Sequence, residues 1–441
     1  MGVLTPPRTP AETALAAAWD DARIHAPWRR AAFARFAKAG LPHRRIEAWR
    51  YTDLRALLRA ALPMRAPDHA DVAWARARLE ALPIGEALRL VILDGAFRPD
   101  LSDLANVPDG VTVQLLNDAL GGAMGDEIAT HVAPHGMGDD DAMLALNAAL
   151  MQDGVVVRVA AGAHVARPIA IVTLMSGAAP HAAFVRSWVE LGDGARAAVV
   201  EINDSPAAAI QSHETLVVAV GAGAHCEHVA HVGYQGAAAM QVHSLLVTLG
   251  AHASFDGFCF VADGGLVRRQ IFARLDGEYA RIGLRGLSLL RGAEQADTTL
   301  VIDHAVPHGE SREFFRHILD GEATGVYQGR VCVRQHAQKT DGAMKSQTLV
   351  LSDGASMFNK PELEIFADDV VCGHGATVGQ LDDDQIFYLQ ARGLPRAEAQ
   401  ALLLEAFANE ALDHVSDETL RAHFSQEARA WLARRSAGSS P

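Results

Sequence analysis

Cysteine is scarce in this 441-residue chain, and the cysteines present are widely spaced. The four of them are Cys226, Cys259, Cys332 and Cys372. Because no two are arranged as Cys-x-x-Cys, a zinc ribbon and a complete local set of iron–sulfur ligands are excluded. So few cysteines also exclude a disulfide scaffold, and they favour a reduced, cytoplasmic compartment.

Several other features are missing. Basic residues number 39 against 53 acidic ones, so we expect no general nucleic-acid-binding surface, which needs a basic excess. No apolar run approaches the length of a membrane span, and no secretory signal is recognised at the N-terminus. The chain also has no phosphate-binding loop, dinucleotide fingerprint, nucleophile elbow or His-Glu-x-x-His motif. We therefore expect a protein without catalytic activity of its own.

The chain divides by its patterns into three parts. Residues 1–151 predict a mostly helical domain, with a capping box at Thr9 to Glu12 and helices over 29–39, 45–58 and 142–151. Residues 152–381 predict a β-rich core. Residues 382–441 predict a C-terminal helical domain, whose helices begin at Asp382, Pro395 and Ser416.

Glycine-containing turns recur through the middle part. Apolar runs of strand length alternate there with these turns, and most successive turn glycines lie 27 to 33 residues apart. A repeat of this length predicts a stacked β-solenoid, in which each coil buries its apolar face against the next. A large β-sandwich is the alternative, since it also has many short strands.

A broad apolar stripe marks one of the C-terminal helices. It comprises Leu403, Phe407, Ala411 and Leu412, which recur at helical spacing. Because the stripe is broader than one packing contact requires, we interpret it as a partner-binding surface.

Two His/Cys clusters are candidates for metal chemistry. In the first, His225 to His231, strand alternation separates Cys226 and His228 from His225, Glu227 and His231. We favour a polar outer face with an inert inward cysteine over a metal site here.

The second cluster, Cys372-Gly373-His374, places both donors on one face of an extended segment. Two donors do not complete an iron site, so the missing ligands must come from another chain. A buried cysteine beside a hydrogen-bonded histidine is the alternative.

Long motifs resemble the SufB/SufD family of iron–sulfur cluster assembly proteins, and within it the SufD branch. The run 362–379 is similar to the family's signature stretch, and the similarity to the family extends to Leu394. The run 47–54 resembles the family's N-terminal E-x-W-[KR]-Y-T motif, and 146–151 resembles the helix before the core. The Cys-rich N-terminal motif and the C-E-H-E sequence of the SufB branch are absent.

The resemblance implies a fold and partners. The fold is a right-handed parallel β-helix flanked by N-terminal and C-terminal helical domains. The partners are a SufB-like paralogue, paired through the β-helices, and a SufC-like ATPase, bound through the C-terminal helices. His374 would lie at the interface with SufB and serve as a ligand of iron or a nascent cluster, with Cys372 in support.

Because the chain lacks a full ligand set, we expect no stoichiometric cluster in the isolated chain. A purely structural partner of SufB and SufC, with no contact to iron, is the alternative. A homodimer of the isolated chain, the cluster type and the role of the first His/Cys cluster stay open.

Overall fold

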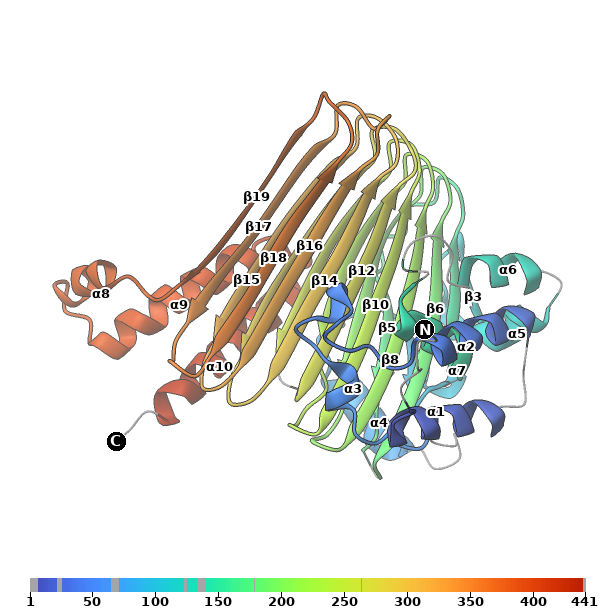
Figure 1. Ribbon diagram of the computed structural model, residues 1–441, viewed down its shortest axis with the longest axis horizontal. Helices are drawn as coiled ribbons and strands as arrows, with labels where there is room; N and C mark the ends of the chain where they lie inside the picture. The colour runs from blue at the N-terminus through green and yellow to red at the C-terminus, as the bar shows by residue number, and fades with distance from the viewer. Residues whose placement is uncertain are drawn as a thin grey trace, which may run out of the picture.

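The computed structural model describes residues 7–438 except 22–25, 65–70, 123–124, 133–137, 139, 178 and 263. Two β-sheets face each other along a flattened solenoid (Figure 1). The ten-stranded sheet runs in the order β19 (Val371–Gly379), β17 (Asp341–Val350), β15 (Glu310–Leu319), β13 (Arg281–Leu290), β11 (Ser254–Ala262), β9 (His225–Val232), β7 (Arg196–Asp204), β5 (Ile169–Leu174), β1 (Leu88–Leu93) and β2 (Ala96–Phe97). The nine-stranded sheet runs in the order β18 (Ser356–Ile365), β16 (Thr324–Val333), β14 (Gln295–His304), β12 (Leu266–Leu275), β10 (Ala239–Leu249), β8 (Ile210–Val220), β6 (His181–Leu191), β4 (Val155–Val159) and β3 (Val111–Leu115).

From β4 to β19, odd and even strands alternate between the two sheets, which is the connectivity of a coil. Ser254 of β11 pairs in parallel with His225 and with Arg281, which precede and follow it by 29 and 27 residues. The spacing of coils therefore agrees with the spacing of turn glycines. The predicted parallel β-solenoid is confirmed, and the β-sandwich alternative is wrong because sandwich strands pair antiparallel.

One corner of the solenoid requires a left-handed backbone at each coil. Early coils place glycine there, for example Gly194 and Gly223 with φ of 68° and 65°. Later coils place His252, Tyr279 and His308 at the same corner, with φ between 58° and 62°. Their rings stack in a column, with centroids 5.0 and 4.5 Å apart. Stacking offsets part of the backbone strain of a non-glycine residue in this region.

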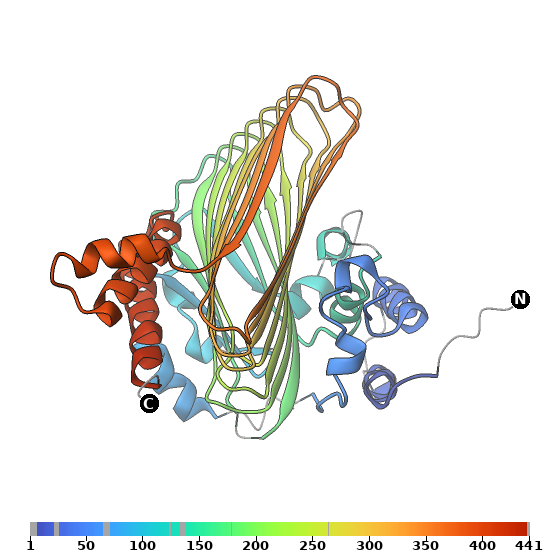
Figure 2. The same ribbon diagram turned by 60° about the vertical axis from the view of Figure 1, so that its left-hand side comes forward.

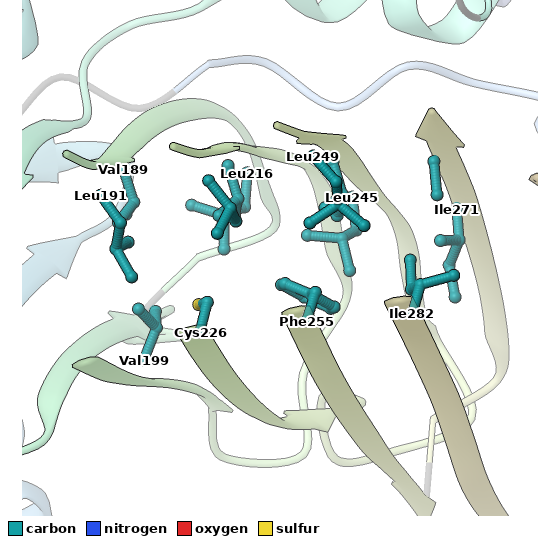
Figure 3. Packing of buried hydrophobic residues seen from close by; sticks show 14 of the residues in the cluster. Val189, Leu191, Val199, Leu216, Cys226, Leu245, Leu249, Phe255, Ile271 and Ile282 are labelled. Carbon is teal, nitrogen blue, oxygen red and sulfur yellow. The ribbon is translucent and has the colours of Figure 1, made fainter. Parts of the chain in front are cut away.

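The core lies between the sheets. Figure 3 shows Leu216, Leu245 and Ile271 of the nine-stranded sheet meeting Phe255 and Ile282 of the other. These side chains repeat at matching register positions, so each coil continues the apolar surface of the one before. A continuous core of this kind is what makes a stack of thin coils stable.

The N-terminal part covers the start of the solenoid and one face of it. β3 pairs antiparallel with β4, and β2 pairs antiparallel with β1. Its helical segments are α1 (Pro10–Asp21), α2 (Pro27–Ala39), α3 (Leu54–Leu57), α4 (Val72–Ala81), α5 (Leu116–Gly121), α6 (Gly125–Val132) and α7 (Ala142–Leu150), with short 3-10 turns at Glu47–Trp49, Pro99–Leu101 and Leu104–Asn106. Helix α7 contacts β6 and β8 of the nine-stranded sheet, and α2 packs on α7.

The N-terminal capping box forms as predicted. The backbone N–H of Thr9 donates to Glu12 Oε2 at 2.7 Å, and the N–H of Glu12 donates to Thr9 Oγ1 at 3.2 Å. The predicted helix over 45–58 is wrong: only a 3-10 turn and the four-residue α3 form there. Backbone carbonyls in this segment accept hydrogen bonds from the solenoid, and those contacts replace the regular helical pattern.

The C-terminal helices are α8 (Asp383–Gln390), α9 (Arg396–Leu412) and α10 (Glu418–Gly438). They lie on the opposite side of the solenoid from α1, α2 and α7 (Figure 2), whereas α4 belongs to the same apolar cluster as α9 and α10. Helix α9 contacts β13 and β15 of the ten-stranded sheet. The start of α10 is capped by Asp417, which accepts from the N–H groups of Thr419 and Leu420, and not by Ser416 as predicted. In the part of the chain that the structure describes, no helix is long and apolar enough to cross a membrane.

Candidate functional site

The candidate site lies on the last strand of the solenoid. Cys372 and His374 are on β19, which pairs with β17 and forms one end of the ten-stranded sheet. Cys372 packs against the apolar core between the sheets, so the two donors face inward, two residues apart on one strand face. His374 is exposed because no further coil covers β19.

The environment of Cys372 is set by its neighbours in register. Cys372 pairs with Gly342, which pairs with Ser311. A Cβ placed at Gly342 would lie 3.5 Å from both Cys372 Sγ and Ser311 Oγ, which is ordinary van der Waals contact, so this position also has room for alanine. Burial raises the pKa of the Cys372 thiol, and the carboxylates of Asp341 and Glu313 add to this rise. The thiol of the isolated chain is therefore mostly protonated at neutral pH. A nearby positive charge, such as a metal ion, would favour its thiolate form.

Glu313 is a neighbour that sequence reasoning missed. It stands two strands behind His374 in register, with Met344 between them. Burial raises the pKa of Glu313 to about 8. One sequence signal could have identified Glu313: it is a charged residue at an inward strand position, next to the aromatic pair Phe314 and Phe315.

The donors fit iron but do not complete a site. A thiol and an imidazole are the soft and borderline ligands that iron accepts in proteins. Among the described residues, no group of three or more His, Cys, Asp or Glu side chains could hold a metal ion. The chemistry available at β19 is therefore that of a partial ligand set at an open edge.

Apolar side chains surround this edge. Phe366 is 61% exposed, Val371 73% and Val378 53%, and Phe358 and Ile365 are also exposed. All five come from β18, β19 or the turn between them. Exposed apolar residues gathered at one end of a molecule mark a surface for another protein. We call these five residues the open-edge patch.

The predicted stripe on α9 is not an open surface. Ala411 and Leu412 are 0% and 1% exposed, and they belong to the apolar cluster under α9 and α10. Phe407 packs against the same cluster, and its ring lies 4.2 Å from the guanidinium of Arg316. The breadth of the stripe is thus explained by packing on the solenoid, because α9 must cover several strands. Leu403 is half-buried.

The exposed apolar residues of the C-terminal part lie elsewhere. Phe387 and Tyr388 of α8 are 70% and 57% exposed, and Leu402 of α9 is 47% exposed. Figure 1 shows α8 projecting away from the solenoid. A contact with another protein through these helices would therefore be made at their projecting end.

The E-x-W motif anchors the N-terminal segment to the nine-stranded sheet. Trp49 is buried, its Nε1 donates to Asp141, and its ring lies 4.2 Å from the guanidinium of Arg268. Arg268 also forms a fully buried ion pair with Asp297, whose Oδ2 accepts from Thr52 Oγ1. The motif therefore has a structural role here.

The first His/Cys cluster divides between two faces, as strand alternation predicts. Cys226 and His228 point inward and are buried, and burial raises the pKa of the Cys226 thiol. His228 Nε2 lies 2.7 Å from the buried carboxylate of Glu201. His231 on the outer face lies 3.5 Å from Glu427 of α10. The inward histidine thus belongs to a buried polar cluster, which the prediction did not foresee.

Comparison with known proteins agrees with this architecture. Residues 173–407 match the family model described as SUF system FeS cluster assembly, SufBD core domain, and residues 17–171 match the SufBD protein N-terminal region. The iron-sulfur cluster assembly protein SufD of Escherichia coli (strain K12) is 31% identical over 394 residues, covering 87% of this chain and 88% of that protein. A SufBD family protein of Synechocystis is 29% identical, covering 88% and 86%. The chain therefore belongs to the SufBD family and is a SufD-like iron–sulfur cluster assembly protein.

Proposed function

We propose that this chain is the SufD-like subunit of a cluster assembly scaffold and contributes His374, with Cys372 in support, to iron or a nascent cluster. The observation that carries this proposal is the position of the two donors on a solenoid edge that the chain leaves uncovered. A partner that stacks on β18 and β19 would bring its own ligands within reach of both.

The partner for this edge is a SufB-like paralogue. The open-edge patch is apolar and is formed by the last two strands of the solenoid and the turn between them, so it suits a second solenoid that presents similar strands. A SufC-like ATPase is proposed for the projecting end of α8 and α9, where Phe387, Tyr388 and Leu402 are exposed. In this arrangement the chain acts as a cytoplasmic scaffold with no catalytic activity of its own and holds a cluster only within the complex.

The decisive experiment uses the complex co-expressed anaerobically with the SufB-like and SufC-like subunits. In the His374→Ala variant, bound iron and acid-labile sulfide should fall by about tenfold or more, because loss of a ligand weakens metal binding at least as much as loss of a supporting group. Assembly of the three subunits should be unchanged, since His374 is exposed and contributes little packing. Cys372→Ala should have a smaller effect.

The matched control is His164→Ala, which removes another exposed histidine of the solenoid, in the turn between β4 and β5 near the opposite end from β19. It should retain the wild-type iron and sulfide content. If the His374→Ala complex assembles clusters at the wild-type rate and yield, the ligand role is wrong. The chain would then be a structural partner without contact to iron.

A further inference from the structure

One corner of the solenoid carries a column of stacked rings at positions that favour glycine. The column consists of His252, Tyr279 and His308, which adopt a left-handed backbone on three successive coils. The two coils before them place Gly194 and Gly223 at this corner. A left-handed backbone costs free energy at a residue other than glycine, and residues held in it cluster at ligand-binding and active sites. The column is therefore a candidate binding surface.

The rings are fixed in orientation because they stack on one another. The ring planes of His252 and Tyr279 are 4° from parallel at a centroid distance of 5.0 Å, and those of Tyr279 and His308 are 8° from parallel at 4.5 Å. All three residues are exposed, and because both faces of Tyr279 are covered, the column presents ring edges and polar groups to solvent. Aromatic ring edges carry positive partial charge, and the phenol and the imidazoles supply hydrogen-bond donors. The side of the column therefore favours an anion.

A hollow of about 400 Å³ lies beside the column. It is lined by the three residues of the column together with Arg281 and Glu310. Arg281 is the first residue of β13 and follows Tyr279 by two residues. It is exposed, and it forms no ion pair or side-chain hydrogen bond with any residue that the structure describes. Its guanidinium therefore has donors available for a ligand.

One acidic residue also lines the hollow. Glu310 is the register partner of Arg281 on β15, but its carboxylate forms an ion pair with the guanidinium of Arg312, 3.3 Å away. Arg312 also pairs with Asp341, so it offsets part of the charge of Glu310. The charge of Arg281 is left unpaired, although the chain as a whole carries a net charge of -14. The hollow is therefore a local exception in an acidic protein.

We propose that the ring column and Arg281 bind a phosphate-type oxyanion. The donors come from two positions in the fold, the guanidinium at the start of a strand and the imidazole and phenol groups of the corner. A tetrahedral phosphate presents oxygens in several directions and accepts from both positions, whereas the two oxygens of a carboxylate lie in one plane. Free phosphate and a phosphomonoester share this chemistry.

The site is confined to the middle coils of the solenoid. Towards the start, Gly223 ends the column because it has no ring. Towards the open end, Lys339 occupies the same corner on the next coil, where it pairs with Asp369. The hollow includes no residue of β19 or of the C-terminal helices. The site is therefore independent of the proposed function, and a negative result would leave that function untouched.

Titration of the isolated full-length chain with inorganic phosphate tests the proposal. Chloride keeps the ionic strength constant, and NMR follows the imidazole signals of a chain with isotope-labelled histidine. The signals of His252 and His308 are identified from the variants His252→Gly and His308→Gly, since glycine suits this corner. Both signals should shift to saturation with the same dissociation constant, and acetate should bind at least about tenfold more weakly.

A parallel titration with glycerol 3-phosphate distinguishes the two sources of the oxyanion. Binding tighter than that of inorganic phosphate supports the proposal with a phosphomonoester as the ligand. Equal or weaker binding supports it with free phosphate as the ligand.

Arg281→Gln removes the unpaired charge. It should weaken phosphate binding by about tenfold or more, the factor expected from loss of a charge-assisted hydrogen bond. The matched control is Arg196→Gln. Arg196 is also exposed and begins β7 two residues after its own corner, but the corner residue there is Gly194, so no ring lies beside it. The control should bind phosphate as the wild type does.

Tyr279→Gly removes the middle ring and suits the left-handed backbone, so the fold should persist, which circular dichroism checks. It should weaken phosphate binding by about fivefold, the factor expected from one neutral hydrogen bond. Absence of a saturable shift at His252 and His308 would overturn the proposal, as would acetate binding as tight as that of phosphate. Equal losses in Arg281→Gln and Arg196→Gln would show a general charge effect, and wild-type binding by Tyr279→Gly would show that the rings take no part; either result also overturns it.

Discussion

The two ends of the solenoid are built in opposite ways. Strand β1, near the start, is almost entirely buried, and antiparallel partners and helices cover the first coils. Strand β19, at the other end, is almost entirely exposed. An uncovered strand edge is a template for pairing with another chain, and monomeric proteins usually block it with charges, proline or a covering helix. The start of the solenoid is therefore covered by other parts of the chain, whereas its end presents the open strand edge at which we propose that a partner pairs.

The largest expected effect is a loss of stability when the contacts that hold the N-terminal segment on the solenoid are removed. Arg268→Met should lower the free energy of unfolding by about 3–5 kcal/mol, because it leaves Asp297 charged and unpaired in a fully buried position. It also removes the contact with Trp49. Urea denaturation followed by circular dichroism measures the change.

Arg274→Met is the matched control on the same strand. Arg274 is only partly buried and pairs with Asp276 at the surface, so its loss should change stability by less than about 1 kcal/mol. Equal effects of the two substitutions would contradict the role of Arg268 as the anchor of the cover.

A smaller effect on stability, but a marked one on assembly, is expected at the open end. Val371→Lys combined with Val378→Lys places two charges in the open-edge patch. Pairing with the SufB-like partner should weaken by about 30-fold or more, as expected when an interface core loses about 2 kcal/mol. Isothermal titration calorimetry measures the affinity, and the thermal unfolding of the chain alone should be nearly unchanged.

Ala222→Lys adds a charge at the exposed turn between β8 and β9, several coils from the patch, and it should leave the affinity unchanged. Undiminished pairing of the double lysine variant would show that the partner does not bind at this edge. The exposure of β19 would then not be explained by partner binding.

The smallest expected effect concerns the C-terminal helices and pH. Burial opposes ionisation of Glu427, but the hydrogen bond from His423 at 3.1 Å and the nearby charge of His231 outweigh it and lower the pKa of Glu427. A carboxyl pKa that is lower in the folded state contributes stability above the ordinary carboxyl range, and this contribution is lost as pH falls through the folded pKa. Acidification should therefore loosen α10 from β9, because Glu427 joins His423 to His231.

Fluorescence of the buried Trp431 on α10 reports this loosening. The difference between wild type and Glu427→Gln, measured from pH 6 to pH 3, isolates the contribution of this carboxyl. Identical pH profiles of the two proteins would show that Glu427 does not hold the helix.

Local patterns were predictable wherever short-range contacts decide the structure. The capping box at Thr9 and Glu12 and the coil period in the middle of the chain follow from neighbouring residues and from glycine at strained corners. The segment 45–58 was predicted as one helix and is not, because Arg268, more than 200 residues away, binds the carbonyl of Ala48. For the candidate site, alternation placed Cys372 and His374 on one face, but it carried no information about Glu313 behind them.

The sequence by itself determined the solenoid, the helical flanks and the shared strand face of Cys372 and His374, because each depends on a repeat or a spacing that is read along the chain. Only the tertiary structure decided which apolar residues are open. It buries Ala411 and Leu412 on the inner face of α9 and exposes Phe387 and Val371. It also decided that His243, Arg269 and Thr298 are buried register partners on three successive strands of one sheet. Exposure and register partners are set by residues from distant coils, and the order of residues along one strand does not contain them.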